Sequence, residues 1–301
     1  MKLVISRKRP GKLFPSFAKR TLLLLSVFLV LSNLAFVMAQ GVMPDSAALM
    51  RLAIRGDAYL DGSGLFIAIR ESALIPSFGI AMLVFVALSL GHFFKFGPKD
   101  MSAEKPEDEI PWWSLGARIV HGIVAITFVI LFISGLMITF GKYLGGGGGT
   151  LFMRIMHEFS GLIFAPAVLV MIVMWIGESI PKAYDLEWFA KFGGYLGYKG
   201  ELKSGKFNAG QKLWYWVMAI TGILLSLSGL ALFFKLGEME SMRTYIIIHF
   251  FSAIPMMLMF LVHLYMTTLG TKGALMGIIH GRFSKKAAEA YHSEASALKN
   301  L

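Results

Sequence analysis

The 301-residue sequence contains no cysteine. This absence excludes disulfide bonds, thiolate zinc sites, iron–sulfur clusters held by this chain and cofactors attached through a Cys-x-x-Cys-His motif. A metal ion in this protein must therefore be bound by histidine, methionine or carboxylate side chains.

Charge is also scarce. Charged residues make up 16% of the chain and hydrophobic residues 56%, with a mean hydropathy of +0.67. Because soluble proteins usually carry about 25% charged residues, this composition excludes a soluble enzyme and a disordered chain. The net charge of +11 lies mainly in segments between apolar runs, as is typical of membrane proteins. We therefore expect contact with membrane lipid and no nucleic-acid partner.

The N-terminus combines a basic stretch, an apolar run from residue 21 to about residue 37, and small residues ending at Ala39. This order predicts that residues 1–39 are a signal peptide, with an uncleaved membrane helix as the alternative. In both cases residues 40–72 form an extracytoplasmic segment.

Five further apolar segments are each long enough for the roughly 20 residues that span a bilayer. They cover residues 73–94, 115–140, 151–176, 212–236 and 245–269. The sequence thus predicts an all-α membrane protein, in which an additional transmembrane helix at 73–94 precedes a four-helix bundle over 115–270. The loop 95–114, which holds Lys95, Lys99 and Lys105 among acidic residues, and the basic tail 271–301 are predicted to be cytoplasmic, which places the C-terminus inside.

A run of five glycines at 145–149 separates the second and third of these segments. It is not followed by the Lys-Ser/Thr of a phosphate-binding loop, so we expect a flexible or closely packed turn.

Four histidines fall within the apolar segments, where a polar side chain is costly and usually functional. Two of them, His249 and His263, are 14 residues apart in one segment. At about 100° and 1.5 Å per residue, their rings leave nearly the same helix face about 21 Å apart. Pro255 lies between them, and a kink there would change this offset.

The direction of the chain sorts the histidines by depth. His121 and His263 are predicted to lie near the cytoplasmic side and are called the inner pair. His157 and His249 are predicted near the opposite side and are called the outer pair. Two imidazoles at each of two depths are what bis-histidine haem ligation in a helical bundle needs. The sequence therefore predicts two b-type haems, with an iron bound by each pair.

Glycine and arginine residues near these histidines are also consistent with a porphyrin-binding site. Gly161, Gly122 and Gly135 provide bare backbone that could admit a flat macrocycle or a neighbouring helix. Arg118 and Arg154 each precede a predicted ligand by three residues, so they could pair with haem propionates. Ordinary snorkelling at a helix end is the alternative for both arginines.

The other three histidines, His92, His280 and His292, are expected to be interfacial or solvated. Two other classes of protein use histidines within a membrane. A proton-relay transporter normally adds intramembrane acids, but these segments have almost none beyond Glu158. A bare membrane anchor has no need of two matched pairs.

Three strings then suggest a family. They are Arg154-Ile-Met-His157-Glu-Phe-Ser-Gly161, Lys206-Phe-Asn-Ala-Gly-Gln-Lys212 and Leu261-Val-His263-Leu-Tyr-Met266. From about Trp112 to His292 the chain resembles the cytochrome b (gamma) subunit of membrane-bound respiratory formate dehydrogenase. The signal-like N-terminus and the helix at 73–94 lie outside this core. The cytochrome b subunits of nickel–iron hydrogenases and thiosulfate reductases are the alternative.

The resemblance implies a four-helix diheme cytochrome b in the bacterial cytoplasmic membrane. An alpha subunit with a molybdenum or tungsten pterin would oxidise formate outside the cytoplasm, and an iron–sulfur beta subunit would pass electrons to the outer haem. This chain would reduce quinone as part of that oxidoreductase, and would have no formate-oxidising site of its own.

The resemblance also implies a site for menaquinone or ubiquinone beside the inner haem. Asn208 and Gln211 match the family's quinone-site string, and His263 is expected close by. The alternative for Asn208 is a plain helix N-terminal signal, with Lys212 at the membrane surface. The aromatic residues at 214–216 are interpreted as an interfacial belt rather than a quinone clamp.

Overall fold

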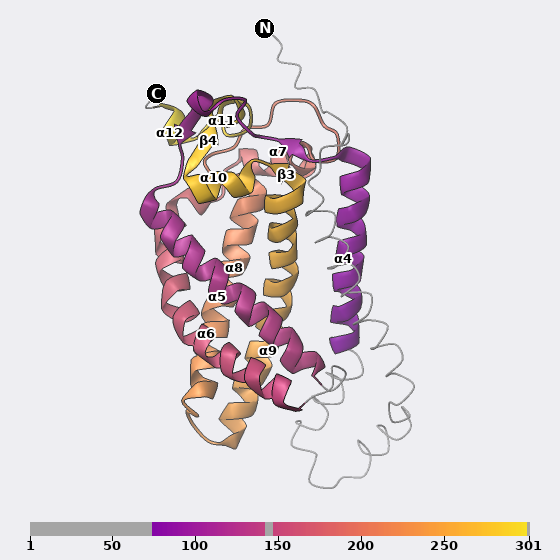
Figure 1. Cartoon of the computed structure of the whole chain (residues 1–301), viewed down its shortest axis with the longest axis vertical. Coiled ribbons are helices and arrows are strands. Elements are labelled where there is room, and N and C mark those ends of the chain that lie inside the picture. Colours follow the sequence, from indigo (N-terminus) through magenta and orange to yellow (C-terminus); the bar gives the residue numbers. More distant parts are fainter. Residues whose placement is uncertain (1–73, 142–146, 300–301) are drawn as a thin grey trace.

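The computed structural model of the chain describes residues 74–141 and 147–299 and is dominated by long helices that form an elongated bundle (Figure 1). The predicted signal peptide, the predicted extracytoplasmic segment and residue 73 lie outside the described residues. Five of the described helices are long and apolar enough to cross a membrane. They are α4 (Ile75–Phe96), α5 (Leu115–Phe140), α6 (Gly147–Trp175), α8 (Ala209–Phe233) and α9 (Met239–Tyr265).

The helices begin and end close to the predicted positions, but α6 and α9 begin earlier, at Gly147 and Met239 instead of residues 151 and 245. Helix α6 starts at Gly147, so the last three glycines of the run lie in its first turn and not in a separate turn. Helix α9 runs without interruption through Pro255, and Met266–Gly270 then form a π-helical turn, η5. Membrane helices tolerate an internal proline because neighbouring groups can satisfy the backbone carbonyl that it leaves unpaired.

Helices α5 and α6 form one antiparallel hairpin and α8 and α9 form another (Figure 1). Side chains from all four helices interdigitate in one buried cluster, including Phe128 of α5, Val168 of α6, Met218 of α8 and Met256 of α9. Helix α4 packs against α9 outside this bundle, where Met82 and Met257 share a second cluster. Large apolar side chains also cover the outer surface, as expected for helices that face lipid.

Short elements gather at one end of the bundle (Figure 1). They comprise η2 (Pro106–Asp108), η3 (Gly177–Ser179), α7 (Tyr184–Ala190), η4 (Phe192–Gly194), α10 (Ala274–His280), α11 (Lys285–Tyr291) and α12 (Ser296–Lys299). Strand β1 (Lys99–Asp100) pairs in parallel with β3 (Thr271–Lys272), and β2 (Glu109–Pro111) pairs antiparallel with β4 (Arg282–Ser284). These strands join the loop before α5 to the C-terminal tail. We call the four strands with α10, α11 and α12 the cap.

The cap has a small apolar core that includes Trp112, Phe283 and Ala288. His292 is buried beside this core and is only 4% exposed, so the expectation that it is interfacial or solvated is wrong. Its ring packs against Trp112 and Phe283 at 5.6 and 5.7 Å, and its Nδ1–H donates to the Gly205 carbonyl over 2.8 Å. Burial lowers the pKa of His292 to about 4, because the charged form would lose its hydration.

The remaining two histidines outside the pairs differ from each other. His280 is exposed at the end of α10, as expected. His92, near the end of α4, donates from Nε2–H to the Tyr195 carbonyl over 3.1 Å. Its Nδ1 therefore accepts from the Tyr265 hydroxyl over 2.5 Å, which ties α4 to α9.

Candidate functional site

The four intramembrane histidines meet as the two expected couples. The ring centres of His121 and His263, from α5 and α9, are 6.3 Å apart at the end beside the cap. Those of His157 and His249, from α6 and α9, are 6.1 Å apart near the opposite end. Helix α9 supplies one ring to each couple, because its two histidines lie nearly four turns apart on one face.

These separations can be compared with the geometry of a metal held between two imidazoles. An imidazole nitrogen lies about 2 Å from its metal, and the ring centre about 1 Å farther back, so two opposed rings have centres about 6 Å apart. Both couples fit this spacing. Within the described residues, no cluster of three or more histidine, cysteine, aspartate or glutamate side chains could hold a metal. The candidate metal ligands that these residues offer are therefore two pairs of imidazoles.

The glycines near the couples fall into two groups. At Gly122 and Gly161 an added Cβ would meet no atom within 4 Å, so the backbone borders open space. At Gly135 a Cβ would lie 3.6 Å from His157 Cε1, which is an ordinary van der Waals contact. At Gly229 the corresponding distance to His249 Cε1 is 3.2 Å, which is tight, so this glycine allows the close approach of the ring to α8. The first group borders open space and the second borders the rings of the outer pair.

Two serines hold the outer pair, and neither was predicted from the sequence. Ser134 Oγ lies 2.8 Å from His157 Nδ1, and Ser228 Oγ lies 3.0 Å from His249 Nδ1. Each serine is followed by glycine and leucine, and this repeated Ser-Gly-Leu string is the signal that could have revealed them. Nδ1 is thereby occupied in both rings, which leaves Nε2 as the nitrogen for a metal.

Indole rings surround the inner pair instead. Trp214 of α8 stacks on His263, with centres 5.3 Å apart and planes 20° apart, and Trp175 of α6 lies 6.0 Å from His121. Tyr215 is only 2% exposed and donates its hydroxyl to the Ile172 carbonyl. The interpretation of residues 214–216 as an interfacial belt is therefore wrong for Tyr215, which packs inside the bundle.

Asn208 and Gln211 form a reciprocal capping box at the start of α8. Asn208 Oδ1 accepts the Gln211 N–H over 3.0 Å, and Gln211 Oε1 accepts the Asn208 N–H over 2.9 Å. The two side chains lie at the first turn of α8, at the same end of the bundle as Trp214 and the inner pair. Each amide uses its oxygen in the box, so its NH2 group is the part that can donate to a ligand.

The next residue, Lys212, is buried, whereas the alternative interpretation of Asn208 placed it at the membrane surface. It is 4% exposed, and its Nζ lies 2.8 and 3.1 Å from the carboxylate oxygens of Asp185, which is 5% exposed. The Lys182 backbone N–H also donates to this carboxylate, over 2.7 Å. The ion pair fastens α7 to the start of α8, because either charge alone would be costly to bury.

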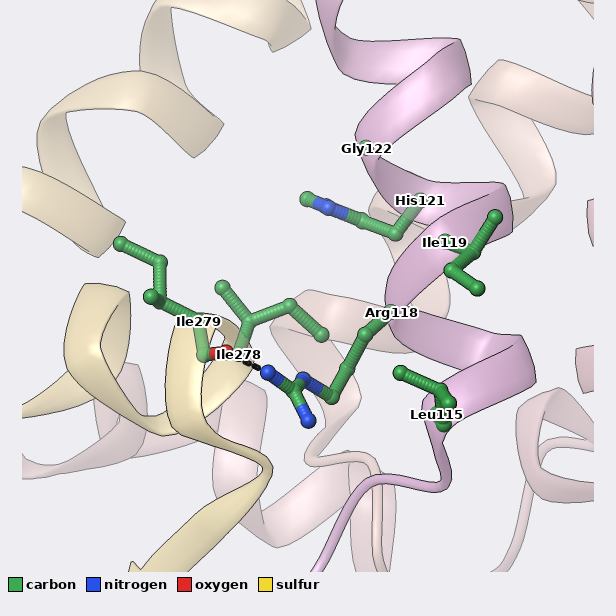
Figure 2. Close-up of a pocket in the computed structure, with 7 residues that line it drawn as sticks. All are labelled: Leu115, Arg118, Ile119, His121, Gly122, Ile278 and Ile279. Carbon is green, nitrogen blue, oxygen red and sulfur yellow. Dashed lines mark hydrogen bonds between the residues drawn. The ribbon is translucent and has the colours of Figure 1, made fainter.

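A cavity of about 270 Å³ opens beside His121 between α5 and α10 (Figure 2). Leu115, Arg118, Ile119, His121, Gly122, Ile278 and Ile279 line it. Arg118 reaches across to donate to the Ile279 carbonyl (Figure 2). Its Nε is buried, and among the described residues it has no hydrogen-bond partner, so one donor remains for an anionic group at this edge.

Arg154 differs from Arg118. Its Nε donates to Glu158 over 3.0 Å, one turn along α6, and its side chain is 70% exposed. An exposed ion pair of this kind is weak, so it could exchange for another anion at little cost.

Taken together, the fold and the paired histidines define a multi-pass helical membrane protein whose interior is arranged for a metal-centred cofactor. The sequence profile of the family described as prokaryotic cytochrome b561 matches residues 112–281, and the chain belongs to this family. It is therefore a membrane cytochrome b of electron transport, and membership of a cytochrome b family implies that it binds haem b.

Characterised relatives agree with this membership. The nitrate-inducible formate dehydrogenase cytochrome b556(Fdn) subunit of Escherichia coli K12 is 30% identical over 189 residues, covering 58% of this chain and 84% of the relative. The formate dehydrogenase cytochrome b556(fdo) subunit of the same strain is 24% identical over 195 residues, with 62% and 92% covered. The formate dehydrogenase cytochrome b556 subunit of Haemophilus influenzae is 27% identical over 187 residues, with 58% and 77% covered.

Proposed function

We propose that this chain is the membrane-anchoring cytochrome b subunit of a bacterial formate dehydrogenase, carrying two b-type haems. The observation that supports it most is the pairing of four imidazoles at two levels with metal-like spacing. His121 and His263 would bind the inner iron, and His157 and His249 the outer iron. When bound, the haems supply one-electron transfer from an extracytoplasmic donor to quinone on the cytoplasmic side.

The chain's own residues would hold each haem in a defined orientation. The bare backbone at Gly122 and Gly161 leaves space for the macrocycle beside a ligand from the same helix. Arg118 offers its unpaired Nε–H to a propionate of the inner haem. Arg154 would bind a propionate of the outer haem in exchange for Glu158.

The quinone site would lie beside the inner pair. Asn208 and Gln211 would donate from their NH2 groups to a quinone carbonyl, while the capping box fixes their oxygens. His263, stacked on Trp214, would bring the inner haem to the same end of the bundle. Water at this end would deliver the protons that quinone reduction consumes, so turnover would separate charge across the membrane.

The relatives are named as subunits of formate dehydrogenases, which supports partner catalytic subunits for this chain. As the family resemblance implies, an iron–sulfur beta subunit would donate electrons at the outer pair, and an alpha subunit with a molybdenum or tungsten pterin would oxidise formate. The complex would lie in the bacterial cytoplasmic membrane, with the C-terminus of this chain in the cytoplasm because the basic segments cluster at the cap end.

A pyridine-haemochrome assay of the purified chain, with a reduced-minus-oxidised spectrum, tests the haem assignment. We expect two haems b per chain, and fewer than two would contradict the pairing. Affinity purification from the native membrane tests the donor. A molybdopterin or tungstopterin subunit with formate-dependent quinone reduction would support the proposal, whereas a nickel–iron subunit would replace formate with hydrogen as the electron source.

A further inference from the structure

We propose that Ser134 and Ser228 are positioning residues that set the orientation and the reduction potential of the outer haem. This inference rests on the proposed function, since it requires that His157 and His249 bind one iron. It concerns hydrogen bonds that neither the histidine pattern nor the family membership assigns. The two serines come from α5 and α8, so each hairpin supports one of the two rings.

The first of these hydrogen bonds joins Ser134 to His157. Ser134 is fully buried, and its hydroxyl donates to the Ile130 carbonyl of its own helix over 2.6 Å. Because this proton is committed to the backbone, the hydroxyl oxygen accepts the Nδ1–H of His157 over 2.8 Å. The hydrogen bond fixes the tautomer of the ring and leaves the lone pair on Nε2 for iron.

The second hydrogen bond, between Ser228 and His249, repeats this arrangement on the hairpin of α8 and α9. The Ser228 hydroxyl donates to the Leu224 carbonyl over 2.6 Å and accepts from His249 Nδ1–H over 3.0 Å. A glycine follows each serine, and at Gly229 it allows the close approach of the ring, because an added Cβ would lie 3.2 Å from His249 Cε1. Two equivalent serine–histidine hydrogen bonds therefore hold the two imidazole rings that are proposed to bind one haem.

The repeat extends beyond the serines. Thr127 and Thr221 precede the two serines by seven residues, and both Thr-x6-Ser-Gly-Leu strings can be read in the sequence. The threonine hydroxyls donate to the carbonyls of Ile123 and Val217 in the same helices, over 2.7 and 2.6 Å. The threonines thus share the helix and the backbone hydrogen bond of each serine, but not its histidine contact.

A hydrogen bond from Nδ1–H raises the electron density of the imidazole and favours the ferric state of a bound haem. Removing the acceptor should therefore raise the reduction potential of the outer haem. Each tenfold change in the ratio of ferric to ferrous affinity shifts a one-electron potential by about 59 mV. Loss of such a support also typically weakens metal binding by about 10–100-fold.

The test is a redox titration of the haem spectra in the complete, membrane-bound complex, with Ser134→Ala and Ser228→Ala against the wild type. We expect each substitution to raise the potential of the outer haem and to change its low-spin EPR spectrum, which responds to imidazole orientation. The inner haem should be unchanged. Thr127→Val and Thr221→Val are the matched controls, and both haems should keep their wild-type potentials.

A second pair of variants separates the effect of the hydroxyl acceptor from the effect of side-chain shape. Ser228→Thr retains the acceptor and should behave as wild type, whereas Ser228→Val has the outline of threonine without it and should behave as Ser228→Ala. Loss of the outer haem in the Ala and Val variants alone would also support the inference. Equal potentials in the Thr and Val variants, or loss of the outer haem in both, would overturn it. A wild-type chain without two haems would instead defeat the proposed function.

Discussion

The inner and outer histidine pairs have nearly the same ring separation but very different surroundings. Serine hydroxyls hold the outer rings through Nδ1, whereas Trp214 and Trp175 pack against the inner rings. Equal ligands in unequal environments give unequal reduction potentials. In the proposed function, hydroxyl acceptors lower the potential of the outer haem, which favours electron flow from the outer pair to the inner pair.

The two ends also differ in symmetry. At the outer pair, Ser134 and Ser228 are 94 residues apart and act alike on their two rings. This 94-residue correspondence between α5 and α8 does not extend to the inner pair. The residue 94 positions after His121 is Tyr215, whose hydroxyl donates to a backbone carbonyl. The end of the bundle beside the cap is therefore the less symmetric one. It also holds the buried Lys212–Asp185 ion pair and the amide side chains of Asn208 and Gln211.

The largest expected effect is the loss of one haem while the other remains bound. His263→Ala should remove the inner haem and quinone reduction while the outer haem remains reducible by the electron donor. His157→Ala should remove the outer haem and interrupt electron delivery, while the inner haem remains bound. Haem counts and spectra of each purified variant provide the measurement. Loss of both haems from a folded single variant would show that the two couples are not separate sites.

The next effect should be confined to the end beside the cap. Asp185→Asn leaves the Lys212 charge buried without its partner, which typically costs about 3–5 kcal/mol. Thermal unfolding of the solubilised protein should show this loss, and the double variant Asp185→Leu with Lys212→Met should recover most of it. Asp100→Asn is the control, because the Lys272–Asp100 pair is exposed and should contribute less than about 1 kcal/mol.

The next expected effect is a loss of cap stability in acid. The pKa of His292 is about 4 in the folded chain against an ordinary value of 6.5, so the unfolded state binds the proton more readily. The contribution of neutral His292 is complete above pH 6.5 and is lost as the pH falls towards 4, by about 3 kcal/mol at most. The fluorescence of Trp112, which contacts this ring, should report the change.

His292→Gln provides the comparison for this experiment. It replaces the titrating ring with an amide that can still donate to the Gly205 carbonyl. The stability of the cap should then become nearly independent of pH over the same range. An unchanged pH profile in this variant would assign the acid sensitivity to another group.

The smallest effect concerns the stack on the inner pair. Trp214→Leu removes an aromatic contact worth about 0.5–1.5 kcal/mol and should shift the spectrum and potential of the inner haem only. Trp214→Phe keeps a ring at this position and should reduce the shift. A redox titration that resolves both haems measures the difference, and a shift in the outer haem instead would contradict the proposed environment.

The sequence was sufficient for the features that depend on one helix at a time. Hydropathy located the described spans, and the depth of each histidine followed from chain direction, so the two couples could be paired from the sequence alone. The spacing of His249 and His263 remained informative because α9 continues through Pro255. The sequence also left two possibilities for Asn208, and the structure shows the helix cap while its role toward quinone remains a proposal.

Features that join distant segments could not be predicted in this way. The strand pairs that build the cap connect residues about 172 positions apart in sequence, and they bury His292 in a tail that looked solvated by composition. The Lys212–Asp185 pair and the Ser134–His157 bond likewise link side chains from different helices. Lys212 and Asp185 carry no local signal of each other, and the Ser-Gly-Leu string marks the serines without indicating which ring each one contacts.

The sequence by itself determined that the chain is a multi-pass membrane protein, which described helices are long and apolar enough to cross the membrane, and near which end of the bundle each histidine lies. These properties follow from hydropathy and from the fixed rise of a helix, both of which are local. Only the tertiary structure decided what surrounds each ring: hydroxyls at the outer pair, indoles at the inner pair and a folded cap beside it. Those surroundings depend on how helices rotate and pack against one another, which no single segment specifies.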